Sequence, residues 1–68
     1  MVNQHYGTEL RPRRQIEPGT LVKYRGRAYL ASANVAKGLY LFTLSERLRV
    51  TTDNIEVYLN RHGEPLIN

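Results

Sequence analysis

The fold of this chain is decided by the stretch LVKYRGRAY at residues 21–29. Val22 and Tyr24 alternate with polar or charged residues, which is the period-two pattern of a β-strand with one buried face. Gly26 lies between two arginines and accepts the positive φ that a tight reversal of the chain needs. An apolar pattern then resumes, with Tyr29 as its largest side chain. The stretch therefore predicts a β-hairpin.

Short strands and turns are expected on both sides of this hairpin. Pro18 and Gly19 mark a turn before it. The segments expected after the first strand are a return strand at 28–33, a turn at 34–38, the most apolar strand at 39–44, a strand at 48–51 and a last strand at 56–59. Ile55 is expected to enter the core from a short 3₁₀ turn before the last strand.

A helix over residues 39–50 is the alternative, because Leu41, Leu44 and Leu48 have helical spacing. Five short strands at close spacing favour instead a small closed β-barrel, since closure leaves no edge strand unpaired. The predicted fold class is all-β, a five-stranded barrel domain at residues 18–68 with a 3₁₀ turn before its last strand.

Residues 1–17 show neither a helical nor a strand period. Pro12 removes a backbone donor and biases Arg11 away from helical geometry. We therefore expect an extended, flexible and basic N-terminal arm ahead of the barrel.

The chain has 68 residues and no cysteine, which allows one domain at most and excludes disulfides and thiolate zinc sites. A core of this size supplies roughly 3–5 kcal/mol of net stability. We expect barrel closure or assembly into a homo-oligomer to add to it. Neither a membrane-spanning apolar run nor a signal-peptide pattern is found, so the sequence predicts a cytoplasmic protein without a membrane partner.

Enzyme chemistry finds little support in the sequence. Hydroxyl, imidazole and carboxylate groups are scattered without a local catalytic signature. They are Ser32, Ser45, His5, His62, Asp53 and Glu56. The two histidines have no neighbours at metal-ligand spacing, and no glycine-rich phosphate loop occurs. We therefore expect a non-enzymatic protein with no metal and no cofactor.

The net charge of +4 makes polyanions the expected class of partner. Eight of the ten basic residues are arginine, which forms bidentate contacts with phosphate and stacks on flat rings. The basic residues fall into three main groups along the chain. They are Arg11, Arg13 and Arg14 in the arm; Lys23, Arg25 and Arg27 at the first hairpin; and Arg47 and Arg49 on the outward face of a later strand.

One or two exposed tyrosines beside these arginines would form a platform on which nucleobases stack. At least two of Tyr24, Tyr29 and Tyr40 are expected in the core, whereas Tyr58 shares a face with Glu56 and is the surface candidate. We therefore expect an accessory protein that binds DNA or RNA through the three basic groups and Tyr58. The alternative is a docking module, or a small subunit of a larger complex, that binds an acidic protein surface.

Three segments resemble the small SH3-like barrels of KOW, Tudor and ribosomal proteins. They are PGTLVKY at 18–24, RGRAY at 25–29 and DNIEV at 53–57. The resemblance implies a small barrel in which a 3₁₀ turn leads into the last strand. Barrels of this kind serve many functions, so the resemblance does not select one.

A more particular likeness is to the small barrel near the C-terminus of Mu-like transposases. It is carried by VKYRGRAY at 22–29, LRV at 48–50, DNIEVY at 53–58 and RHGE at 61–64. The catalytic carboxylate core of those enzymes is absent from this sequence. The likeness therefore implies a fold and no transposase activity.

Overall fold

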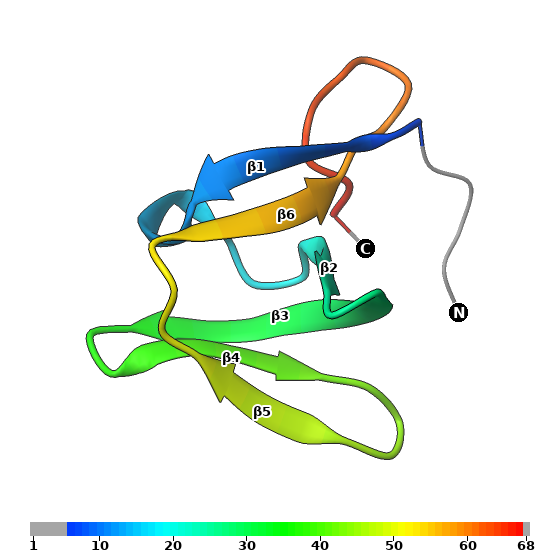
Figure 1. Cartoon of the computed structure of the whole chain (residues 1–68). Helices are drawn as coiled ribbons and strands as arrows, with labels where there is room; N and C mark the ends of the chain where they lie inside the picture. The colour runs from blue at the N-terminus through cyan, green and yellow to red at the C-terminus, as the bar shows by residue number, and fades with distance from the viewer. Residues whose placement is uncertain (1–5, 68) are drawn as a thin grey trace.

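A computed structural model describes residues 6–67 of the chain. These residues form six strands and one 3₁₀ helix (Figure 1). The elements are β1 (Thr8–Pro12), η1 (Arg13–Gln15), β2 (Leu21–Tyr24), β3 (Arg27–Val35), β4 (Gly38–Phe42), β5 (Arg47–Val50) and β6 (Asn54–Tyr58). Residues 6–67 form no helix of the length and apolar character needed to cross a membrane.

All six strands belong to one antiparallel sheet in the order β1-β6-β2-β3-β4-β5. β2 pairs with both β6 and β3, so it joins the two halves of the sheet. Figure 1 shows β1 and β6 on one side and β3, β4 and β5 on the other, with β2 between them. β1 and β5 end the order without pairing with each other, so the sheet is open.

The core lies between the two halves of the curled sheet. Alternate residues of the strands supply it, as the period-two pattern predicts. Leu39 and Leu41 of β4, Ile55 and Val57 of β6 and Val22 of β2 are each at most 2% exposed. This alternation confirms the all-β fold class and excludes the helix considered for residues 39–50, which instead contain β4 and β5.

The β2–β3 hairpin reverses at Arg25 and Gly26, as predicted. Both residues have positive φ, 52° and 77°, which is the geometry of a type I′ turn. Such a turn follows the right-handed twist of the two strands. Gly26 adopts this conformation without steric cost, and it makes the tight connection possible.

The structure corrects the expectation of a flexible arm over residues 8–17. β1 pairs with β6 over its full length, η1 follows, and the Ile16 side chain is 4% exposed in the core. β1 lies at the edge of the sheet and buries none of its side chains fully, so its sequence carries no strand period. The rest of the expected arm, residues 1–5 with His5, lies outside the described residues.

The number of strands, the closure of the sheet and the position of the 3₁₀ turn also differ from expectation. β1 is a sixth strand, and the sheet stays open rather than closing into a barrel without edges. The 3₁₀ turn lies farther upstream than expected, at Arg13–Gln15, where Ile16 N–H donates to the Arg13 carbonyl oxygen at 3.1 Å. Ile55 enters the core from within β6.

Candidate nucleic-acid interface

Two aromatic rings and two arginines lie on the outward face of the β4–β5 hairpin. Leu39 and Leu41 of β4 point into the core, so Tyr40 and Phe42 point outward and are each 37% exposed. Arg47 and Arg49 are exposed on β5 in the same way. The register places Tyr40 opposite Arg49 and Phe42 opposite Arg47. Directly opposite residues have Cβ atoms about 4.5–5.5 Å apart, so each ring lies within reach of a guanidinium. We call these four residues the β4–β5 platform.

The surface around the platform combines a hollow with apolar side chains. A hollow of about 460 Å³ is lined by Tyr40, Phe42 and Arg47 of the platform, together with Leu41 of β4 and Ser32 of β3. Leu30 of β3 lies opposite Phe42. At the tip of the hairpin, Leu44 is fully exposed. The platform therefore continues onto β3 on one side and onto the hairpin tip at its end.

The charge of the platform is not neutralised by a neighbouring acid. Within residues 6–67, neither Arg47 nor Arg49 forms an ion pair. The acid in the same hairpin, Glu46, accepts a hydrogen bond from the Tyr29 hydroxyl at 2.7 Å and lies 3.8 Å from Arg27. Two positive charges thus remain available on the outward face.

Gly38, the first residue of β4, allows Arg49 to lie against the backbone. A Cβ at this position would be 2.7 Å from Arg49 Cγ and 3.0 Å from the Val50 carbonyl oxygen. Real Cβ atoms essentially never make a contact as short as 2.7 Å, so with any residue other than glycine at this position the stem of Arg49 would have to shift. The packing helps to fix where the guanidinium leaves the sheet.

The predicted basic group at the first hairpin lies beside rings and acids. The Arg25 guanidinium carbon lies 5.3 Å from the centroid of the Tyr24 ring, a cation–π contact. Arg27 forms the ion pair with Glu46, and Lys23 lies opposite Glu56 in the β2–β6 register. These cations are exposed or half-buried but partly compensated, unlike the platform arginines.

Beneath this hairpin, Tyr29 links the core to Glu46. Tyr24 and Tyr29 meet edge to face, with centroids 6.4 Å apart and planes at 68°. The hydrogen bond to the Glu46 carboxylate, followed by burial, raises the pKa of Tyr29 above its ordinary value. Because the folded state favours the protonated phenol, this contact stabilises the fold below about pH 10 and loses its effect as the pH rises through the folded pKa.

Replacing Tyr29 with Phe removes the hydroxyl and keeps the ring. We expect Tyr29→Phe to lower the thermal midpoint at neutral pH. The difference from the wild type should shrink above about pH 10, where the wild-type phenol ionises beside a carboxylate. Thermal unfolding followed by circular dichroism from pH 7 to pH 11 tests this, and a difference independent of pH would contradict the role given to the hydroxyl.

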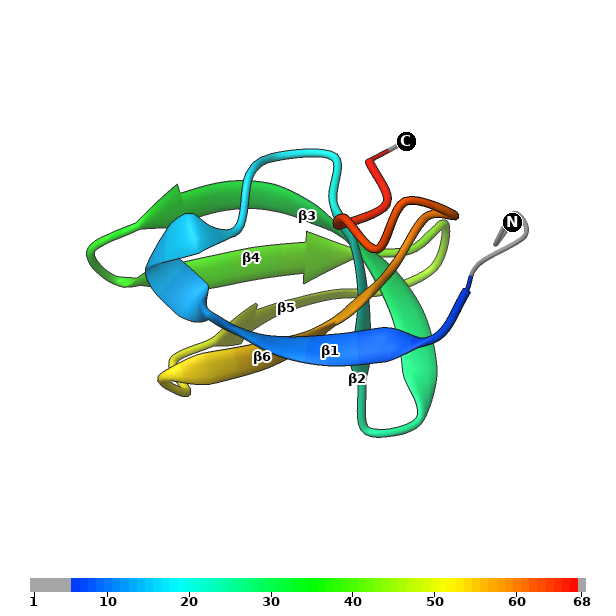
Figure 2. The ribbon, with the colours of Figure 1, turned by 90° about the horizontal axis from the view of Figure 1, so that it is seen from above.

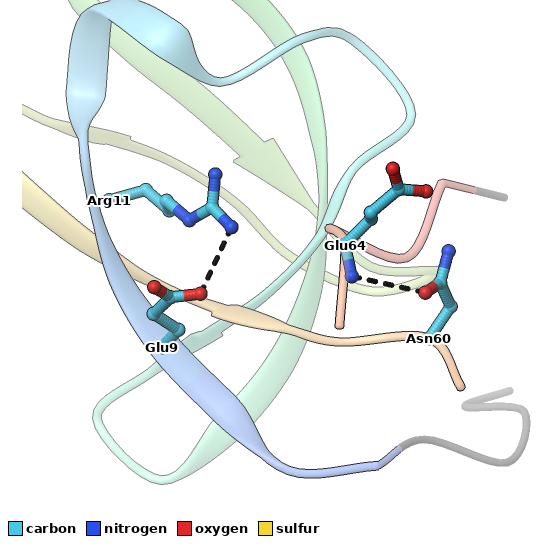
Figure 3. Close-up of polar contacts among 4 residues, drawn as sticks. All are labelled: Glu9, Arg11, Asn60 and Glu64. Atoms are coloured by element: carbon cyan, nitrogen blue, oxygen red, sulfur yellow. Dashed lines mark hydrogen bonds and ion pairs between the residues drawn. The ribbon is translucent and has the colours of Figure 1, made fainter. Parts of the chain in front are cut away.

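Two of the three arginines predicted in the arm take part in intramolecular contacts. Arg11 Nη2 lies 3.0 Å from Glu9 Oε1 (Figure 3). Arg13 Nη1 donates to Asn34 Oδ1 at 3.1 Å, and Asn34 Nδ2 donates to the Arg13 carbonyl oxygen at 2.6 Å. Arg14 is exposed on η1. Arg11 and Arg13 are therefore held by contacts within the fold rather than on a separate flexible segment.

A second hollow, of about 350 Å³, lies between η1 and the C-terminal segment. Arg11 and Glu64 both line it, on opposite sides in Figure 3. Glu64 N–H donates to Asn60 Oδ1 at 3.1 Å, and Glu17 adds another carboxylate to the lining. Two acids against one ion-paired arginine make this hollow a poor site for a polyanion.

Tyr58 was predicted to be an exposed site residue, but the structure buries it. It is 8% exposed, so it offers no surface for stacking. Thr8 of β1 lies opposite it, and Leu66 N–H donates to its carbonyl oxygen at 2.8 Å, so both terminal segments flank it. The expectation of an exposed Tyr58 was wrong because β1 was not recognised as a strand.

Besides Tyr6, two aromatic residues are exposed, Tyr40 and Phe42, and the sequence reasoning missed both. Within LYLF at 39–42 both alternating sets are apolar, so the pattern does not say which set faces the core. The partner strand carries the missing signal, because its arginines must point outward. Pairing the two strands would have placed both rings on the arginine face.

The described residues contain no cluster of three or more histidine, cysteine or acidic side chains able to hold a metal ion.

A family model described as the KilR SH3-type barrel domain matches residues 6–58, from just before β1 to the end of β6. No curated protein and no solved structure matches the chain.

Proposed function

Because the chain belongs to the family of KilR SH3-type barrel domains, we propose that it is a non-enzymatic binding module and that it binds nucleic acid through the β4–β5 platform. Small barrels of one fold serve many functions, so the proposal rests on the site. The observation that carries it is the pairing of Tyr40 with Arg49 and of Phe42 with Arg47 on one exposed face. Neither arginine has an acidic partner within the described residues.

Phosphate groups are the partner that best fits these two arginines. A guanidinium binds phosphate through two parallel hydrogen bonds, and each phosphate contact releases condensed counterions. The net charge of +4 adds long-range attraction to any nucleic acid. Both DNA and RNA supply this chemistry.

Docking on an acidic protein surface is the second candidate function. Leu44 favours it, because a fully exposed leucine at a hairpin tip suits an apolar pocket on a protein and has no use on a phosphate backbone. In that case the chain would bind its protein partner with one-to-one stoichiometry and would not bind random oligonucleotides.

Fluorescence anisotropy with labelled DNA and RNA, single-stranded and duplex, at about 50 and 200 mM salt tests the proposal. We expect the affinity to fall steeply with salt. In Arg47→Gln/Arg49→Gln, two phosphate contacts are lost, so the slope of log affinity against log salt should become shallower by about 2. Binding at low salt should weaken at least about tenfold.

The matched control is Arg14→Gln/Arg61→Gln, which removes the same charge from exposed positions off the platform. Its slope should change by much less than that of the platform variant. Equal effects of the two double variants would show a general charge effect and would contradict the assigned face. An absence of binding to every oligonucleotide at low salt would favour the docking function.

A further inference from the structure

We propose that the platform receives unpaired nucleobases, one stacked on Tyr40 and the next on Phe42, so that the chain selects single strands over duplexes. This inference rests on the proposed function and specifies the ligand of the same site. Single-strand binding proteins combine aromatic rings with cations that follow the backbone, and the platform contains both.

The spacing of the two rings decides between single strand and duplex. Tyr40 and Phe42 are two residues apart on one strand, which places them about 6.6–6.8 Å from each other. Successive bases within a stacked strand of a duplex are about 3.4 Å apart. Adjacent bases can meet both rings only if they are unstacked and spread, which a single strand permits and a duplex does not.

The platform also holds its rings in place before a ligand arrives. Tyr40 and Phe42 are each 37% exposed, so the larger part of each residue is already covered by the fold. Arg49 is positioned by its contact with Gly38, and each arginine lies across from a ring in the register. Little side-chain entropy is then lost on binding, which favours affinity from few contacts.

The hollow beside the rings offers a polar group to the edge of a stacked base. Ser32 lines it together with Tyr40, Phe42 and Arg47. A hydroxyl both donates and accepts, so it does not discriminate strongly among bases. We therefore expect a preference for single strands with little preference for sequence.

The test uses the full chain and three probes of about 12 nucleotides, a length within the range of small-barrel sites. The probes are a thymidine strand, a strand of the same length with abasic deoxyribose units, and a duplex. We expect the wild type to bind the thymidine strand at least about tenfold more tightly than the abasic strand.

Tyr40→Ala/Phe42→Ala should remove the preference for the thymidine strand and leave binding to the abasic strand unchanged. Arg47→Gln/Arg49→Gln should weaken both by a similar factor. Tyr6→Ala, at a tyrosine that is 54% exposed off the platform, is the matched control and should keep the preference. Tyr40→Leu/Phe42→Leu retains apolar bulk without aromatic stacking and should also lose the preference if the variant folds as the wild type does.

The outcomes separate this inference from the proposed function. Equal wild-type affinity for the thymidine and abasic strands would overturn the stacking inference while phosphate binding stands. Tighter binding to the duplex than to the thymidine strand would also overturn it. Failure of the wild type to bind any probe would overturn both.

Discussion

A chain that begins at Pro18 is expected to show no cooperative unfolding transition. This deletion removes β1, η1 and Ile16, a core residue that is 4% exposed. Loss of a buried isoleucine side chain alone costs about 2–5 kcal/mol, which approaches the whole net stability of a domain of this size, roughly 3–5 kcal/mol. The deletion also leaves β6 without the strand with which it pairs along its full length.

The shortened chain should show weak near-ultraviolet circular dichroism and a poorly dispersed proton NMR spectrum. A chain beginning at Tyr6 is the control, since it keeps every contact described here and should unfold cooperatively. Ile16→Ala in the full chain gives the graded version, with an expected loss of about 2–5 kcal/mol. A sharp transition in the chain from Pro18 would restore the view of residues 6–17 as a dispensable arm.

Gly38→Ala is expected to have the second large effect, on both stability and binding. The residue has a φ of 146°, a conformation that costs other residues about 1–3 kcal/mol. Its new Cβ would lie 2.7 Å from Arg49 Cγ, and crowding of this kind costs about 1–3 kcal/mol more. Relief of the clash requires Arg49 to move, so oligonucleotide affinity should fall as well.

Gly63→Ala separates the two costs expected for Gly38→Ala, which are the strained backbone conformation and the crowding of Arg49. Gly63 also has a positive φ, 78°, but no atom lies within 4 Å of a Cβ built there. This control should show only the backbone cost and unchanged binding. Urea denaturation of both variants measures the difference in the free energy of unfolding. Equal losses of stability would mean that the Arg49 side chain moves aside at no cost.

The β2–β3 hairpin was predictable because its signals are local. Alternation, the glycine and the arginines beside it lie within nine consecutive residues, and Arg25 with Gly26 forms the turn as expected. The alternation at Arg47–Val50 was similarly clear, because charged and apolar residues occupy opposite faces. The two outward arginines were therefore identified correctly as exposed.

The missed elements depend on contacts between distant residues. β1 is a strand because β6 pairs with it. The sequence of β1 contains no pattern that indicates this partner, which lies more than forty residues away along the chain. The same omission misplaced Tyr58. In β4, Tyr40 and its neighbours are all apolar, so only the register with β5 shows which set is exposed.

The pairing of the first strand with the last has a consequence for synthesis of the protein. The Thr8 hydroxyl donates to the Glu56 carboxylate across β1 and β6, so these segments meet only after nearly the whole domain has been translated. At about 5–20 residues per second, β1 waits seconds for its partner, while the hairpins between them can already form. The sheet is then completed only once β6 has been translated and becomes available for pairing with β1 and β2 together.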